Sequence, residues 1–268
     1  MLHLGKRNVL GIQIDAIDYE SAVAQILAAA REGCGFSVSA LAVHGVMTGV
    51  DDREHQFRLN HFDLICPDGQ PVRWMLNAAH DAALVNRVYG PFLTLRVCEA
   101  AAREGLGIFL FGATAGSLAA LGANLRERFP ALIVTGMRPS RFRQATPTEV
   151  EEDVATIRGS GARICLCGIG CPRQEVWAYE MRDRLSMPVL AVGAAFDFLS
   201  GARPMAPAWM QSHGLEWLYR LSLEPRRLWH RYLVLSPRFI WHAARQLVFK
   251  RTHDPADAIP PKSECRHG

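Results

Sequence analysis

The sequence predicts an α/β fold, a Rossmann-like, mostly parallel sheet with helices on both faces, followed by a basic helical C-terminal appendage. Short apolar runs alternate with helical patterns through most of the 268 residues, as in a parallel sheet whose strands are joined by helices. From Leu215 the pattern becomes helical, basic and aromatic. We therefore expect a Rossmann-like domain at 1–214 and the appendage at 215–252. The segment 253–268 lacks periodicity, which predicts a disordered tail.

The first half of the chain supplies three predicted strands. Residues 9–14 form a short apolar run, after which Asp18 caps an Ala/Leu/Ile-rich helix that ends near Arg31. A second strand at 36–43 precedes a single helix near 46–59. The third strand, 63–66, is brief because Pro67, Asp68 and Gly69 form a turn signal.

The second half continues the alternation. A buried strand at 107–111 leads into the turn 112–116 and a helix that ends near residue 129. Strands at 132–135, 163–167 and 189–192 alternate with helices near 147–158 and 174–185. Parallel sheets bind ligands at the carboxyl ends of their strands. The loops after Val43, Cys66, Phe111, Cys167 and Val192 are therefore the candidate site.

Composition limits the class of protein. The chain is 49% apolar and 21% charged, an ordinary globular balance. Its seven cysteines have no secreted-scaffold spacing, and residues 1–8 contain no apolar signal core, so we expect a cytoplasmic protein. No apolar run reaches the ~18 residues that span a bilayer. Any membrane contact is therefore expected at the surface.

Two glycine-containing loops are candidate phosphate-binding turns. Gly112 begins a turn between a strand and a helix, where backbone N–H groups can approach an anion. This signal is weak, because the G-x-G-x-x-G pattern of nicotinamide-binding folds is absent. The stretch 168–175 is more informative, since Gly170 precedes Arg173, Gln174 and Glu175 in the first turn of a helix. These residues could bind a diphosphate, or the stretch could be a plain tight turn.

Carboxylates at strand ends are candidate bases or caps. Asp68, followed by Gly69, could accept a proton from a hydroxyl nucleophile, although an ordinary Asp-Gly turn is the simpler interpretation. Asp197 follows the last strand and could be functional or a buried cap. Asp51 and Asp52 lie in a polar helical run, which favours a solvated face over a metal pair. The cysteines at 165, 167 and 171 lack zinc spacing, so we predict no metal site.

The appendage combines basic and aromatic residues. From Arg220 to Arg251 there are eight Arg or Lys and one acid, Glu224. This composition suits an anionic lipid surface or a nucleic acid, and packing of the aromatics on the core is the alternative. Pro237 is expected to break this run into two helical segments.

Together these motifs resemble the WecG/TagA/CpsF glycosyltransferases of bacterial surface-polysaccharide assembly, over about residues 9–233. The resemblance rests on motifs that recur in order, the last being the longest: Asp68-Gly69; Arg87-Val-Tyr-Gly90; Phe111-Gly112; Gly168-x-Gly-x-Pro-Arg-Gln-Glu175; Val192-Gly-x-x-Phe-Asp197; and Arg203-x-x-Ala206-Pro-x-Trp209 through Gly214-Leu-Glu-Trp217, Arg220, Glu224-Pro225, Arg227 and Arg231-Tyr232.

The resemblance implies an inverting, metal-independent transfer from a UDP-sugar to a polyprenyl-diphosphate-linked saccharide, with no cofactor. Asp68 matches the family's proposed general base, and Arg87 and Gln174 match polar positions lining the same pocket. Arg220, Arg227 and Arg231 match an appendage thought to close over the site and hold the acceptor diphosphate.

The resemblance also implies partners and a location. It implies an enzyme peripheral on the inner face of the cytoplasmic membrane, bound to its anionic surface, with no nucleic-acid partner. His44 and Phe92 stand where relatives carry Asn and Asp, which leaves the sugar open, as is homo-oligomerisation. Two other functions stay open from the residues: a non-catalytic nucleotide or nucleic-acid-binding module, and a nucleotide-sugar epimerase or dehydrogenase.

Overall fold

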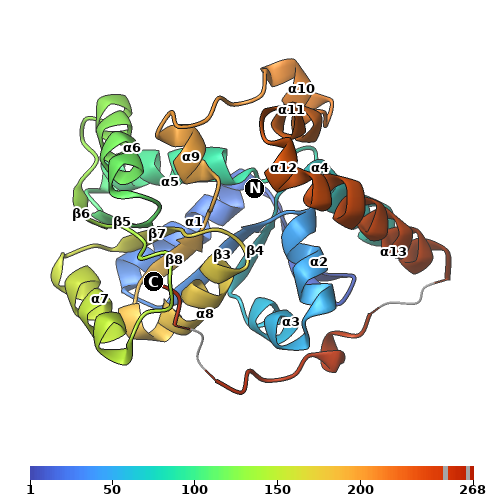
Figure 1. The fold of residues 1–268 in the computed structure, drawn as a ribbon, viewed down its shortest axis with the longest axis horizontal. Coiled ribbons are helices and arrows are strands. Elements are labelled where there is room, and N and C mark those ends of the chain that lie inside the picture. The colour runs from blue at the N-terminus through green and yellow to red at the C-terminus, as the bar shows by residue number, and fades with distance from the viewer. Residues whose placement is uncertain (250–252, 264–265) are drawn as a thin grey trace.

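The computed structural model describes residues 1–249, 253–263 and 266–268 and confirms the α/β fold (Figure 1). Its main sheet has six strands in the order β4-β3-β8-β7-β5-β6, and every neighbouring pair is parallel. The strands are β3 (Phe36–Leu41), β4 (Leu64–Pro67), β5 (Ile108–Gly112), β6 (Val134–Arg138), β7 (Ile164–Gly168) and β8 (Pro188–Ala191). The expected strands from residue 36 onward therefore all exist, within two or three residues of their predicted ends.

The N-terminal segment differs from its prediction. The expected single strand at 9–14 is wrong, because β1 (His3–Val9) and β2 (Ile12–Ile17) form a separate antiparallel hairpin. The turn between them consists of Leu10 at φ 55° and Gly11 at φ 88°. Two successive positive φ values are typical of the tight turns that match the strand twist of a hairpin. An apolar leucine at such a turn gives no sequence signal.

Both faces of the sheet are covered, as the strand sequences require. In β5, Ile108 and Leu110 belong to one apolar cluster and Phe109 and Phe111 to the other. The first cluster includes residues of α1 (Tyr19–Glu32), α5 (Gly90–Glu104), α6 (Ala115–Arg128) and α9 (Ala195–Leu199). The second includes residues of α2 (Val43–Asp51), α4 (Gln70–His80), α7 (Pro147–Gly159) and α8 (Arg173–Leu185), with Leu59 of α3 (Arg53–Asn60).

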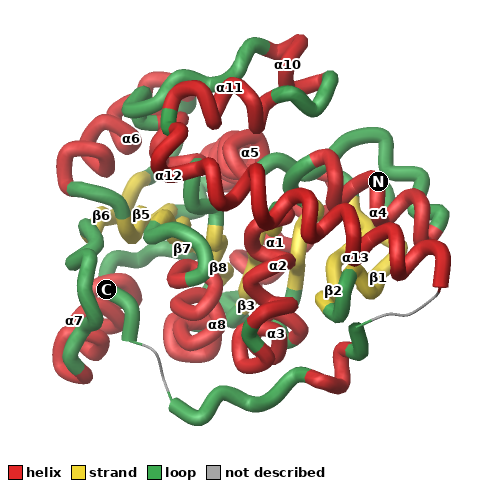
Figure 2. The backbone as a smooth tube through the Cα atoms, turned by 45° about the vertical axis from the view of Figure 1, so that its right-hand side comes forward, coloured by secondary structure: helices red, strands yellow, loops and turns green. Residues whose placement is uncertain are grey.

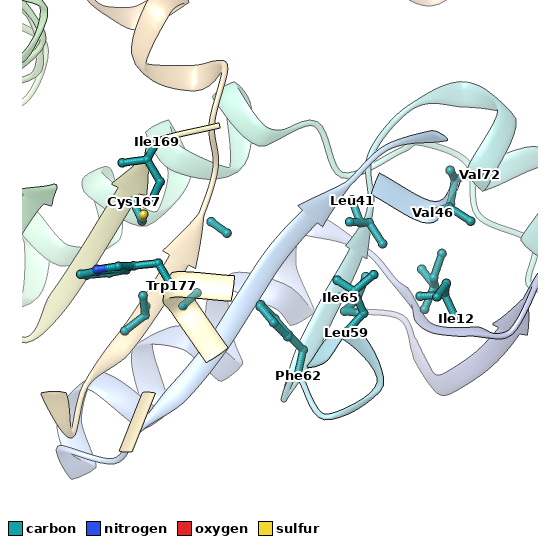
Figure 3. Close-up of a cluster of buried hydrophobic side chains, with 14 of the residues drawn as sticks. Ile12, Leu41, Val46, Leu59, Phe62, Ile65, Val72, Cys167, Ile169 and Trp177 are labelled. Carbon is teal, nitrogen blue, oxygen red and sulfur yellow. The ribbon is translucent and has the colours of Figure 1, made fainter. Parts of the chain in front are cut away.

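Figure 3 shows part of this second cluster, with Trp177 of α8 beside Cys167 of β7. The Trp177 indole stacks on Phe111, with ring centroids 4.3 Å apart.

Helix boundaries follow local capping. Asp18 caps α1 as predicted, since its side chain accepts a hydrogen bond from the Ser21 amide. The single helix expected at 46–59 is wrong, because Asp52 has an extended backbone and caps a second helix, α3, by accepting from the amides of Glu54 and His55. A polar Asp within a helical pattern can therefore start a new helix. Neither α4 nor α5 is predicted from the sequence.

The C-terminal region is helical, as predicted, and lies across one end of the body (Figure 1). It comprises α10 (Ala208–Ser212), α11 (Glu216–Leu223), α12 (Pro225–Trp229), the π-helical segment η1 (His230–Leu235) and α13 (Ser236–Phe249). Pro237 does not break it. In η1 the Ser236 amide bonds the Arg231 carbonyl five residues back, and such a wide turn relieves the clash of a proline ring with the preceding turn. Lys250, Arg251 and Thr252 lie outside the described residues.

One face of α13 packs on the body. Phe239 and Ala243 are buried in the core with Leu235 of η1, and Figure 2 shows α13 crossing in front of α2 and α4. Gln246 is also buried; its Oε1 accepts from the Leu10 amide at 2.9 Å and its Nε2 donates to the Asn8 carbonyl at 2.9 Å. The opposite face is exposed at Ile240, Trp241, Val248 and Phe249.

Beyond the helices, residues 253–263 follow an extended path past α3 and contain one short 3-10 turn, η2 (Pro255–Asp257). Composition predicts disorder here, whereas the structure records hydrogen bonds to the body: Asn8 and Gln56 donate to the His253 and Asp254 carbonyls, and the Ile259 amide donates to Arg53. Among helices in the described ranges, none has the length and hydrophobicity needed to cross a bilayer.

Candidate active site

The candidate site lies at the carboxyl edge of β4, β3, β8 and β7, which are neighbours in that order. Asp68 follows β4, His44 lies in the first turn of α2 after β3, and Gln174 lies in the first turn of α8 after β7. The appendage covers this edge from outside. Loops distant in sequence meet here because parallel strands end at the same edge.

Asp68 is held at the end of β4 by backbone contacts. Its amide donates to the Leu41 carbonyl at 3.1 Å, and Gly69, at φ 92°, turns the chain into α4. Its carboxylate accepts from the Gly90 amide, the first of α5, at 3.4 Å, and lies 3.9 Å from Nη1 of Arg87. The side chain is 17% exposed, so a small substrate group can reach it.

The electrostatics of Asp68 suit a base. Burial raises the pKa of Asp68 to about 6, Arg87 opposes the rise and Glu216 adds to it. A carboxylate with this pKa is ionised at neutral pH and is more basic than an ordinary aspartate. General bases work best when their pKa lies near the working pH.

Arg87 is bound more closely to Glu216 than to Asp68. Nη2 of Arg87 hydrogen-bonds Oε2 of Glu216, the first residue of α11, and the Tyr89 hydroxyl donates to Oε1 of Glu216 at 2.8 Å. The guanidinium also lies over the Tyr89 ring, 4.2 Å from its centroid. Glu216 and Tyr89 belong to the family motifs, but nothing in the sequence around them indicates a role for either.

Four arginines form the outer side of the site and are called here the arginine cluster. They are Arg203, which precedes α10, and Arg220, Arg227 and Arg231 of the appendage. Arg203 pairs with Asp197 at 3.0 Å and with Glu224, and Arg227 pairs with Glu224 at 2.5 Å. Within the described part of the chain, Arg220 and Arg231 form no ion pair. Burial and then Arg220 lower the pKa of both Arg227 and Arg231. The cluster therefore carries excess positive charge, which suits an anionic ligand.

A buried polar group lies at the end of β7. Glu175 and Gln174 are 1% and 4% exposed, and Oε1 of Glu175 accepts from Gln174 Nε2 at 2.8 Å and from the Ser39 hydroxyl at 3.3 Å. Oε2 of Glu175 and Oε1 of Gln174 have no hydrogen-bond partner within the described residues. Burial raises the pKa of Glu175. Buried polar atoms are normally satisfied, so this pair can accept hydrogen bonds from a ligand.

His44 lies where the appendage meets α2. Burial first, and then Arg231, His230 and His55, lower the pKa of His44 to about 4. The imidazole is therefore neutral at physiological pH, and its Nδ1 is buried without a partner among the described residues. A neutral imidazole can donate to or accept from a sugar hydroxyl.

Two predicted binding residues lie apart from this group. Gly112, at φ 118°, packs so closely on Gly168 that an added Cβ would lie 2.7 Å from its carbonyl carbon, and the Thr114 side chain caps the following helix. Close packing of β5 on β7 thus explains why residue 112 is a glycine, without a phosphate-binding role. Arg173 is exposed and acts electrostatically on His267, whereas Gly170, at φ 85°, turns the chain ahead of Gln174.

No group of three or more His, Cys, Asp or Glu in residues 1–249, 253–263 and 266–268 is arranged to hold a metal ion.

The chain was compared with models of protein families. The model described as the glycosyl transferase WecG/TagA/CpsF family matches residues 7–253. The match covers the sheet, the candidate site and the whole helical appendage.

Proposed function

The chain belongs to the WecG/TagA/CpsF family of glycosyltransferases, which act in surface-polysaccharide synthesis, and on that premise we propose that it moves a sugar from a UDP-sugar to a polyprenyl-diphosphate-linked saccharide. The observation that carries the proposal is Asp68, a partly exposed carboxylate with a pKa of about 6 beside the arginine cluster. Asp68 could accept the proton of a hydroxyl nucleophile, and the arginine cluster could bind diphosphates.

The proposed reaction is a single inverting displacement. The acceptor hydroxyl attacks the anomeric carbon of the donor sugar while Asp68 takes its proton, and the bond from that carbon to the UDP oxygen breaks. UDP leaves with the bonding electron pair, and Asp68 later returns the proton to solvent. The base supplies general base catalysis and the bound geometry supplies orientation.

The arginine cluster would bind diphosphate. Arg220 and Arg231 lack ion pairs among the described residues, and Arg227 shares its single acid, Glu224, with Arg203. Guanidinium groups bind phosphate oxygens in bidentate fashion and stay charged, so they can stabilise charge developing on a leaving diphosphate without a metal. We therefore propose metal-independent transfer.

The sugar would lie against the buried polar group at the end of β7. Oε1 of Gln174, Oε2 of Glu175 and Nδ1 of His44 have no hydrogen-bond partner among the described residues, and sugar hydroxyls could supply one to each. His44 and Phe92 occupy positions where relatives carry Asn and Asp, so the identity of the sugar is decided by experiment.

We also propose that the appendage binds the anionic inner face of the cytoplasmic membrane. Its exposed side chains include Trp217, Trp229, Leu233, Ile240, Trp241, Val248 and Phe249. Aromatic and aliphatic groups beside arginines suit a lipid interface, and each basic residue near an anionic leaflet contributes roughly 1 kcal/mol. This surface would bring a lipid-linked acceptor to the arginine cluster.

The test is to offer a panel of UDP-sugars with a short-chain polyprenyl-diphosphate-saccharide and to measure UDP release. We expect release with one donor, dependent on the acceptor, and a loss of ~10²–10⁴-fold in Asp68→Asn, the typical effect of removing a general base. Donor binding should be unchanged in the variant. Absence of acceptor-dependent release with every donor, or a variant that keeps more than half of the wild-type kcat, would contradict the proposal. Bound nicotinamide, detected by absorbance, would instead indicate an epimerase or dehydrogenase.

A further inference from the structure

Glu216 is a buried carboxylate that the proposed mechanism does not use. It is 7% exposed, it is the first residue of α11 in the appendage, and both of its oxygens bond residues of the body. Its partners, Arg87 and Tyr89, lie in the segment whose Val88 amide donates to the Pro67 carbonyl, next to Asp68. Glu216 therefore links the appendage directly to the surroundings of the candidate base.

Arg87 has two carboxylates within reach and forms its close contact with only one of them. Its guanidinium hydrogen-bonds Glu216 but stays 3.9 Å from Asp68, and stacking on Tyr89 fixes its plane. A direct Arg87–Asp68 hydrogen bond would stabilise the ionised form of Asp68 and weaken it as a base. Glu216 thus holds Arg87 in a position that leaves the Asp68 carboxylate open to a substrate hydroxyl.

We propose that Glu216 is a positioning residue that couples docking of the appendage to the basicity of Asp68. When α11 is docked, Glu216 binds Arg87 and Asp68 acts as the base. When α11 moves away, Arg87 is released and pairs with Asp68, so Asp68 is a weaker base until the appendage closes. This inference rests on the proposed function, because it takes Asp68 as the base of the transfer.

The charges around Asp68 determine the sign of the effect. Glu216 raises the pKa of Asp68, while Arg87 and Arg220 of α11 lower it. The other titratable groups that interact with Asp68 are Tyr19 of α1, Cys66 of β4, Tyr89 and Tyr232 of η1. All four are neutral near pH 7, so none can replace the negative charge of Glu216. Loss of that charge lowers the pKa of Asp68 directly and again by releasing Arg87.

The experiment uses the full chain with Glu216→Gln and follows kcat/KM for transfer against pH. The amide keeps the size of the side chain and can still accept from Arg87 or Tyr89. At low pH, kcat/KM falls as Asp68 becomes protonated, and this part of the profile is called the acid limb. We expect the midpoint of the acid limb to move down by about one pH unit, as is typical of a change in a neighbouring charge. We expect kcat to fall severalfold. Glu216→Asp keeps the carboxylate, should leave the limb near its wild-type position, and provides the test if the glutamine variant does not fold.

Glu224→Gln is the matched control. Glu224 is also an appendage carboxylate paired with arginines, but it is not among the groups that shift Asp68. Its variant should leave the acid limb in place whatever its effect on rate. An unmoved limb in a folded, active Glu216→Gln protein, or an equal movement in both variants, would overturn the inference. If the wild-type enzyme releases no UDP with any donor, the proposed function fails instead.

Discussion

Relative to the wild type, replacing Asp68 by Asn should make the protein more stable at pH 8 than at pH 5, in addition to lowering transfer ~10²–10⁴-fold. Asp68 has a folded-state pKa of about 6, above its ordinary value of 3.8, because burial disfavours the charged form. A group with a raised folded pKa gives stability below its unfolded pKa, and that stability is lost as pH rises through the folded pKa. The wild-type protein therefore loses free energy of unfolding between about pH 4 and 7 from this one residue, and the Asn variant does not.

The magnitude follows from the two pKa values. Between pH 8 and pH 5, a carboxyl with pKa values of about 6 folded and 3.8 unfolded contributes about 1.4 kcal/mol, a factor of about ten in the folding equilibrium. The free energy of unfolding of the Asn variant, minus that of the wild type, should therefore be about 1.4 kcal/mol larger at pH 8 than at pH 5. In melting temperature the relative gain is about 3–6 °C. Any pH-independent effect of the substitution cancels in this difference.

The assay is urea or thermal unfolding of both proteins at pH 5 and pH 8. Asp51→Asn is the control, because Asp51 is an exposed carboxylate that pairs with Arg238 on the surface. Its effect should stay within about 0.5 kcal/mol. If Asp68→Asn shows the same stability difference from wild type at both pH values, the pKa of Asp68 is ordinary in the folded protein and the reasoning about its environment fails.

Three further predictions concern the metal, the appendage and its packing. Transfer should survive exhaustive treatment with EDTA, because the arginine cluster supplies the positive charge; loss of activity restored by Mg²⁺ or Mn²⁺ would assign that role to a metal. The variants Arg227→Ala and Arg231→Ala should still float with anionic liposomes but should lose transfer. The double variant Trp229→Ala/Trp241→Ala should float less, and unchanged flotation would show that these two side chains do not bind the membrane. Phe239→Ala should lower the free energy of unfolding by about 3–5 kcal/mol, as for buried aromatics, and exposed Ile240→Ala should change it by about 0.5 kcal/mol or less; equal effects would mean that α13 is not packed as the structure has it.

The sequence predicted the main sheet well because each strand carries its own signal. Apolar runs such as residues 107–111 and 163–167 are bounded by glycine or charge, and both faces of these strands are buried. The hairpin turn at Leu10 and the second helix capped by Asp52 were missed, because their backbone conformations depend on local geometry that composition does not reveal. The helix was also expected to break at Pro237, because the wide π-helical turn before this proline is a feature of the folded backbone.

The candidate site was predictable only in part. Asp68 could be chosen because it follows a strand and matches a family motif. The partner of Arg87 could not, because Glu216 lies 129 residues away in the chain and only the docked appendage brings the two together. The sequence indicates His44 as a departure from the family, but its neutral state depends on burial, on Arg231 and on two nearby histidines.

The hydrogen bonds of Gln246 to the first hairpin affect the order in which contacts can form during synthesis of the chain. Its amide joins α13 to Leu10 and Asn8, 236 and 238 residues earlier in the sequence. Chains emerge from the ribosome N-terminus first, and contacts between distant residues form late. The hairpin must therefore wait, with its polar backbone groups unpaired by Gln246, until nearly the whole chain has been made. Packing of α13 on the hairpin is therefore among the last contacts of the fold to form.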